Sequence, residues 1–298
     1  MCPSCRAFIS SDDRECPYCG VALRSMTAAR VVSSSSGEGL IPEHAFTTYL
    51  LMLINVTLFA ISVYLSYQKG NQRAFSDLDN ETLVLLGAKF TPYIRQAGQW
   101  WRVIMAGFLH GGATHILMNG WALLALGRMT DAIFGSARYL VIYFAGTVGG
   151  FWLSTIWSPA SVSVGASAGL SGLVGAMIAL GFLSKSRVAL DIRDRSLQTV
   201  LLTALLGLLG PLFHLQIDNI AHLGGLVAGF VVAMIVRLPQ PVIPARERLW
   251  TLAAWICVLL TVFAFAQMLI FYTQMHQAPL IPRSAPAPRV REMPRERL

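Results

Sequence analysis

Long apolar stretches, each able to cross a membrane, dominate the hydropathy pattern of the chain. The longest runs from Tyr139 to Ser184 without a charged side chain. It is about twice the ~20 residues that a membrane-spanning helix requires, so it predicts two helices joined by an uncharged turn near 157–163. The remaining pattern predicts five further spans, at Phe46–Tyr67, Gly107–Gly127, Ser196–Ile217, Asn219–Val236 and Leu249–Tyr272. We therefore expect seven membrane helices.

Composition excludes a soluble globular protein. Hydrophobic residues make up 55% of the 298 residues and charged residues only 13%, whereas soluble domains carry about 25% charged residues. The net charge of +8 does not indicate nucleic-acid binding, because no stripe of Lys and Arg with interleaved aromatic residues occurs. We expect a multi-pass protein embedded in a lipid bilayer.

The positive charges predict how the chain crosses the membrane. Arg and Lys gather before the first span and in alternate loops, which is the pattern of cytoplasmic loops. This places the N-terminus in the cytoplasm and the C-terminus on the outer side, and we expect the membrane to be a bacterial inner membrane. The residues that carry the pattern are Arg24, Arg30, Arg128, Arg138, Lys185, Arg187, Arg193, Arg195, Arg237, Arg246 and Arg248.

Two Cys-x2-Cys pairs stand at the N-terminus, Cys2 with Cys5 and Cys16 with Cys19. Two such pairs can place four thiolates around a tetrahedral zinc ion. Disulfides or redox-active pairs are the alternatives, but a cytoplasmic location disfavours disulfides and no βαβ pattern surrounds either pair. We predict a zinc-ribbon-like module over residues 1–22 that takes its folding energy from structural zinc. It could bind a protein partner.

Polar side chains are concentrated in the second predicted span, which carries His110, His115 and Asn119. His115 and Asn119 are four residues apart and share one helix face, and such groups face an interior cavity rather than lipid. A metal site is one alternative, but no carboxylate accompanies them and the spacing is not His-Glu-x-x-His. Neutral His and Asn are donors suited to a developing oxyanion. The Trp-Trp-Arg sequence at 100–102, just before this span, fits an interfacial anchor.

Two serines, Ser167 and Ser171, lie in a glycine-rich stretch at 164–176, where the fourth span begins. A helix N-terminus presents unpaired N–H groups that can stabilise an oxyanion, although small residues there are also typical of helix packing. In the sixth span His222 shares a face with Gly225 and Gly229. Close approach of that face to the fourth span would bring the imidazole to a serine, which favours a serine hydrolase.

Taken in order, these motifs resemble the rhomboid family of intramembrane serine proteases. They are Trp101-Arg102, His110-x4-His115-x3-Asn119, Gly165-x-Ser167 and Ala221-His222-x-Gly224-Gly225, and the match runs from about Trp101 to Gly229. The resemblance implies an all-α fold with a six-helix core, here with a seventh helix added. It also implies a Ser–His dyad that cleaves single-span transmembrane proteins without a catalytic cofactor.

The resemblance assigns His222 as general base, Asn119 and His115 as oxyanion-hole donors, and His110 as a supporting residue. The nucleophile is Ser167 or Ser171. Small residues at +5 and glycine at +8 follow the family serine; from Ser167 these are Gly172 and Gly175, and from Ser171 both are alanines. This favours Ser167, with Ser171 lining the pocket. Asp218, four residues before the histidine, is either its orienting group or an exposed charge at the helix start.

Domain boundaries follow from these assignments. After the zinc module, we expect a flexible linker at 23–44, a rhomboid core at 45–239, the seventh helix at 240–274 and a disordered tail at 275–298. Two rival functions stay open. One is an inactive relative that binds and escorts transmembrane clients, although a binder needs neither the serine nor the histidine. The other is a transporter, which the absence of a convincing internal repeat disfavours.

Overall fold

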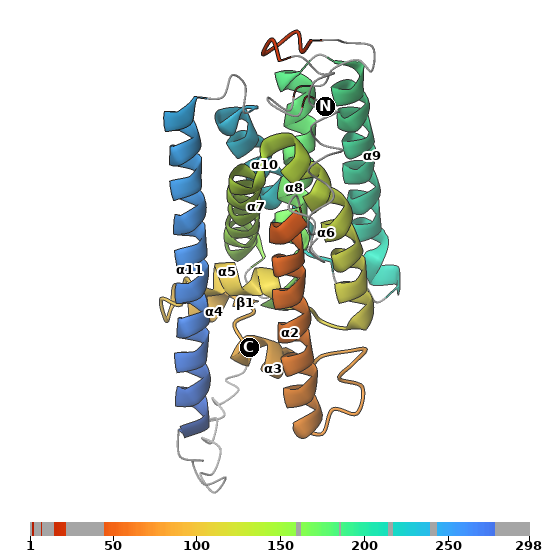
Figure 1. Cartoon of the computed structure of the whole chain (residues 1–298). Helices are drawn as coiled ribbons and strands as arrows, with labels where there is room; N and C mark the ends of the chain where they lie inside the picture. Colours follow the sequence, from red (N-terminus) through yellow and green to blue (C-terminus); the bar gives the residue numbers. More distant parts are fainter. Residues whose placement is uncertain are drawn as a thin grey trace, which may run out of the picture.

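A computed structural model describes residues 2, 7, 15–21, 45–158, 162–184, 186–213, 217–238 and 243–277. Seven long helices dominate this part of the chain, and Figure 1 shows them side by side. The predicted linker at 23–44 and residues 278–298 of the tail predicted at 275–298 lie outside the described residues. The long helices are α2 (Phe46–Gln68), α6 (Ala113–Phe134), α7 (Ser136–Trp157), α8 (Ser167–Leu183), α9 (Arg187–Leu209), α10 (Asn219–Val236) and α11 (Pro244–Gln277).

Short elements fill the connections between the long helices. The segment between α2 and α6 contains most of them, and β2 precedes α8 while η3 follows α9. The two strands pair antiparallel, with Lys89 opposite Ser163 and Phe90 opposite Val162. The predicted all-α class is confirmed, since these strands are two residues each. The short elements are α3 (Asn80–Leu85), β1 (Lys89–Phe90), α4 (Thr91–Arg95), α5 (Arg102–Met105), η2 (Ala106–Phe108), β2 (Val162–Ser163) and η3 (Gly210–Phe213).

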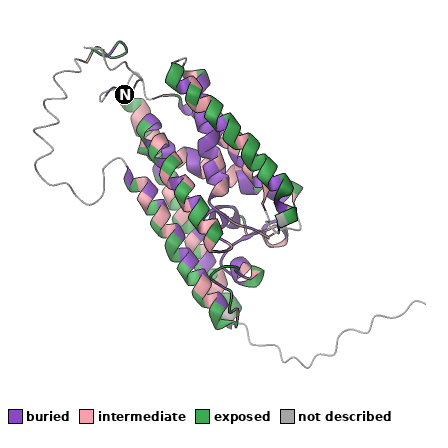
Figure 2. Ribbon diagram, turned by 90° about the vertical axis from the view of Figure 1, so that its right-hand side faces the viewer, coloured by how far each residue is buried: buried purple, intermediate pink, exposed green. Residues whose placement is uncertain are grey.

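Four of the seven predicted spans are long and apolar enough to cross a membrane by length and composition, namely α2, α7, α10 and α11. Helix α8 is apolar but has only 17 residues. Helices α6 and α9 contain polar and charged residues, which lower their mean hydropathy. Large apolar side chains on α9 and α11 are exposed, as expected of surfaces that contact lipid. Figure 2 shows exposed residues along the helix faces that point away from the bundle.

Several helix boundaries differ from the predicted ones. Helix α6 begins at Ala113 rather than at 107, so His110 precedes the helix instead of lying on it. Helix α9 begins at Arg187 rather than at Ser196, with Ser186 as its N-cap. A charge-free window finds the apolar part of a helix, but a helix continues into water where its charged turns are solvated. For this reason Arg187, Arg193, Arg195, Arg246 and Arg248, predicted in loops, and Arg128 and Arg138, predicted to flank a loop, lie within helices.

Helix α8 is the centre of the bundle and packs against α6, α7, α9 and α10. Its contact with α10 is between backbones: a Cβ on Gly229 would lie 2.1 Å from the carbonyl oxygen of Gly172, and one on Gly225 would lie 2.2 Å from that of Ala168. Neither position has room for a larger residue. The predicted close approach of the two helices is confirmed, and it places the first turns of α8 and α10 together.

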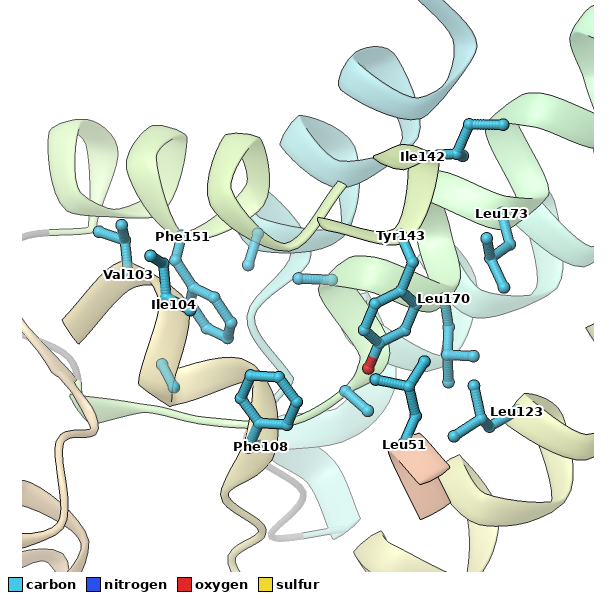
Figure 3. Close-up of a cluster of buried hydrophobic side chains, with 14 of the residues drawn as sticks. Leu51, Val103, Ile104, Phe108, Leu123, Ile142, Tyr143, Phe151, Leu170 and Leu173 are labelled. Carbon is cyan, nitrogen blue, oxygen red and sulfur yellow. The ribbon is translucent and has the colours of Figure 1, made fainter. Parts of the chain in front are cut away.

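The apolar core continues outward from the bundle under the connection between α2 and α6. Val103 and Ile104 of α5 point toward Phe151 of α7, and Phe108 lies beside them (Figure 3). This connection is therefore a packed layer over one end of the helices, and we refer to it as the outer layer. Arg102 in this layer is fully buried, so its prediction as an interfacial anchor is wrong.

Candidate active site

Ser167 is the first residue of α8, and the segment before it is held in place by hydrogen bonds. Strand β2 pairs with β1, and the N–H of Gly165 then donates to the carbonyl oxygen of Ala106 at 2.9 Å. Gly165 has φ +134°, a backbone conformation that only glycine adopts without strain. The chain thereby turns sharply from strand to helix and presents the Ser167 side chain at the helix start.

His222 reaches this serine from the first turn of α10. Its Nε2 lies 2.9 Å from the Oγ of Ser167, across a separation of 55 residues. Asp218 is the N-cap of α10; its carboxylate accepts from the N–H of Ala221 at 2.9 Å and from the hydroxyl of Ser154 on α7. The helix that carries the imidazole is thus fixed at its start to a neighbouring helix.

Asp218 does not act as the third member of a triad in this geometry. Both carboxylate oxygens are already bound, to Ala221 and to Ser154. Among the described residues the only hydrogen bond between Asp218 and His222 is a backbone one, from the N–H of His222 to the carbonyl oxygen of Asp218 at 3.1 Å. The residue is half-buried, so its prediction as an exposed charge is wrong. Sequence reasoning also missed Ser154, because nothing near it in the chain marks a contact with a residue 64 positions away.

Ser171 lies one turn further along α8 and is half-buried. In the described part of the chain no hydrogen bond links its hydroxyl to His222, whose Nε2 pairs with Ser167. The structure therefore pairs the histidine with the serine that the glycine spacing favoured.

His115 faces the segment before the serine from the first turn of α6. A Cβ on Gly165 would lie 2.7 Å from Nε2 of His115 and 3.4 Å from Oγ of Ser167, so imidazole and hydroxyl flank the same backbone atom. The Nδ1 of His115 accepts from the N–H of Gly111 at 3.3 Å. In the neutral ring the proton is then on Nε2, which makes this atom a donor directed at the site.

Asn119 and His110 complete the polar group. Asn119, one turn after His115 on α6, is buried, and its amide nitrogen has no hydrogen-bond partner within the described residues. His110 is fully buried and packs edge to face on His115, with ring centroids 5.1 Å apart. The arrangement supplies a hydroxyl beside an imidazole, together with two donors on the neighbouring helix. Such a set can perform acyl transfer.

The N-terminal cysteines form a second cluster. The Sγ atoms of Cys2, Cys16 and Cys19 all lie within 4.8 Å of one another. Two loop hydrogen bonds shape their surroundings, from the N–H of Cys2 to Ala7 and from the N–H of Gly20 to Cys16. The fourth predicted ligand, Cys5, lies outside the described residues.

Comparison with known proteins places this geometry in a family. The family model described as "Rhomboid domain" matches residues 97–239. Rhomboid-like protein 6, mitochondrial, of Arabidopsis thaliana is 30% identical over 229 residues, which are 66% of this chain and 70% of that protein. The chain belongs to the rhomboid family. As a rhomboid with several long apolar helices, it is a multi-pass integral membrane protein.

Two further relatives of this rhomboid carry the word protease in their names. Rhomboid protease GluP of Bacillus subtilis is 34% identical over 194 residues, 65% of this chain and 35% of that protein. Rhomboid-like protease 1 of Toxoplasma gondii is 33% identical over 198 residues, 65% of this chain and 66% of that protein. The chain spans about a third of the Bacillus protein. The predicted family is confirmed, while the orientation of the termini and the bacterial membrane stay predictions.

Proposed function

We propose that this rhomboid is a serine endopeptidase that cleaves single-span transmembrane proteins within the lipid bilayer, with Ser167 and His222 as its catalytic dyad. The observation that carries the proposal is the 2.9 Å contact between Nε2 of His222 and Oγ of Ser167. Nucleophile and base within hydrogen-bond reach are the signature of nucleophilic catalysis by serine. The protease names of two relatives support the same reaction class.

In the proposed mechanism, His222 accepts the Ser167 proton as Oγ attacks the carbonyl carbon of the scissile peptide bond. The oxyanion that forms is stabilised by the Nε2–H of His115, the amide of Asn119 and the N–H of Ser167. The C–N bond then breaks, and the imidazolium returns the proton to the leaving amine. Water, deprotonated by His222, hydrolyses the acyl-enzyme. Side chains supply both proton transfer and charge stabilisation, so catalysis requires no cofactor.

Incubation of the purified full-length protein with model single-span substrates in liposomes tests this function. We expect two fragments from at least one substrate, and covalent labelling of Ser167 by a fluorophosphonate, which reports an activated serine independently of substrate choice. The rival function is an inactive relative that escorts clients. Stable capture of the substrates with neither cleavage nor labelling would establish that rival.

We also propose that the N-terminal module binds one structural zinc ion through Cys2, Cys5, Cys16 and Cys19. The proposal is supported by the three described thiols, whose Sγ atoms lie within 4.8 Å of one another, because zinc in structural sites prefers four tetrahedral thiolate ligands. A segment this short cannot bury a core, so the metal would supply its folding energy. A module that is folded in this way could bind a protein partner.

Elemental analysis of the purified chain should find about one zinc per molecule, since four thiolates bind one ion. Cys5→Ser should abolish the zinc, because three ligands hold the metal far less tightly. Cys257→Ser is the matched control: Cys257 is a buried residue of α11, and its replacement should leave the zinc content unchanged. Metal-free unmutated protein, or equal zinc in the two variants, would contradict the assignment.

A further inference from the structure

We propose that α11, the helix outside the predicted six-helix core, positions the segment just before Ser167 by supporting the outer layer at Arg102 and at Phe108. The consequence for catalysis rests on the proposed protease function, while the consequence for the local structure does not. Helix α11 stands at the side of the bundle beside α7 and the layer that contains α4 and α5 (Figure 1). It contributes no residue to the dyad.

The first point of support is Arg102, which organises the outer layer from inside. Its guanidinium donates to the carbonyl oxygens of Val84 at 2.6 Å and Ala88 at 3.2 Å, and to the side chain of Gln99 at 2.7 Å. Ala88 immediately precedes β1, so these bonds fix the start of that strand. Strand β1 pairs in turn with β2, which leads into the turn before Ser167.

Three aromatic rings surround the Arg102 guanidinium, and α11 supplies one of them. The guanidinium carbon lies 4.7 Å from the ring centroid of Phe271 on α11, 4.7 Å from that of Trp101 and 4.8 Å from that of Tyr93. Burial lowers the pKa of Arg102 to about 10, so the group is still a cation at neutral pH. Cation–π contacts are strongest when the cation is desolvated, as it is here.

The second point of support is Phe108, at the end of η2. Phe265 of α11, six residues before Phe271, packs edge to face on it, with ring centroids 5.6 Å apart. Two residues before Phe108, the carbonyl oxygen of Ala106 accepts the N–H of Gly165 at 2.9 Å. The contact of Phe265 with Phe108 thus supports the turn before Ser167 through a second series of contacts.

The first turn of α11, at the opposite end of the helix from Phe271, is held separately. Arg138 of α7 is buried and makes a two-pronged ion pair with Glu247 in the first turn of α11, at 2.6 and 2.7 Å. A pair of this geometry fixes direction as well as distance. With that end fixed, the register of Phe265 and Phe271 against the outer layer is determined.

Both routes end on residues 162–165, which place the Ser167 hydroxyl relative to His222. Loss of either ring leaves space into which the outer layer can relax, and nucleophilic attack is sensitive to such movement, since a displacement of about 1 Å can cost on the order of 100-fold in rate. Phe265 and Phe271 are therefore positioning residues, which touch neither substrate nor dyad.

The test compares Phe265→Ala and Phe271→Ala with Phe263→Ala in the full-length protein. Phe263 is the matched control, a phenylalanine on the same helix that is 54% exposed. We expect kcat to fall on the order of 10- to 100-fold in the two test variants, with KM nearly unchanged, and neither to change in the control. Phe271→Tyr keeps an aromatic ring over Arg102, so its kcat should be close to that of the unmutated protein.

Hydrogen exchange gives a readout that does not need activity. Amides at 162–168 should exchange on the order of tenfold faster in Phe265→Ala and Phe271→Ala than in the unmutated chain, and at the unmutated rate in Phe263→Ala. Unchanged exchange at 162–168, or equal losses in test and control variants, would overturn the positioning role. Inactive unmutated protein with the expected exchange pattern would instead contradict the protease function alone.

Discussion

Ser167→Ala and His222→Ala should each lower the rate of cleavage of a single-span substrate by about 10⁴-fold or more, because each removes one half of a unit that acts together. The alanine at 167 has no oxygen to attack the carbonyl, and the alanine at 222 leaves the Ser167 proton without an acceptor. Initial rates on the same substrate in liposomes measure both effects. The double variant should cleave the substrate only slightly more slowly than either single variant.

Ser171→Ala is the control for this prediction. It removes a hydroxyl one turn along the same helix, and we expect cleavage to persist, because His222 pairs with Ser167 and not with Ser171. Thermal unfolding of each variant in detergent establishes that the fold is retained. Cleavage that survives Ser167→Ala but not Ser171→Ala would make Ser171 the nucleophile and leave the hydrolase function standing.

His115→Ala and Asn119→Ala should each lower kcat by about 10²- to 10³-fold, with KM little changed, as expected when one oxyanion donor is lost. The reason is specific to each residue. The bond from Gly111 to Nδ1 of His115 leaves its Nε2 as the donor, and the buried Asn119 amide nitrogen has no partner of its own among the described residues. Both donors are thus free to hydrogen-bond to the oxyanion, which exists only during the reaction.

Steady-state kinetics on one substrate separate this role from a general loss of structure. Met118→Ala is the control, since Met118 lies beside Asn119 in sequence but is 63% exposed on the outer face of α6. It should leave kcat unchanged. Equal damage by Met118→Ala, or a rise in KM with normal kcat after His115→Ala and Asn119→Ala, would mean that the two residues bind substrate or support the fold rather than stabilise the oxyanion.

Sequence by itself determined which parts this protein is built from. Apolar length predicted all seven long helices, because the bilayer sets how many residues a span requires. The i, i+4 spacing of His115 and Asn119 placed both on one face, and Gly225 and Gly229 predicted a close helix contact, since both follow from the geometry of a single helix. Local rules did not find where α6 and α9 begin: α9 starts in charged turns before its apolar stretch, whereas α6 starts only after Gly112, inside its apolar stretch.

Only the tertiary structure decided which of these parts meet. Ser167 and Ser171 are equivalent by residue type, and the backbone contact of α8 with α10 selected Ser167 for His222. Arg102 is a second example. Its neighbours in the sequence predicted an interfacial anchor, but its guanidinium is enclosed by the rings of Tyr93 and of Phe271 on α11, which are far apart in the chain. Contacts between residues far apart in the chain depend on how whole helices pack, and that packing has no signature in the residues beside either partner.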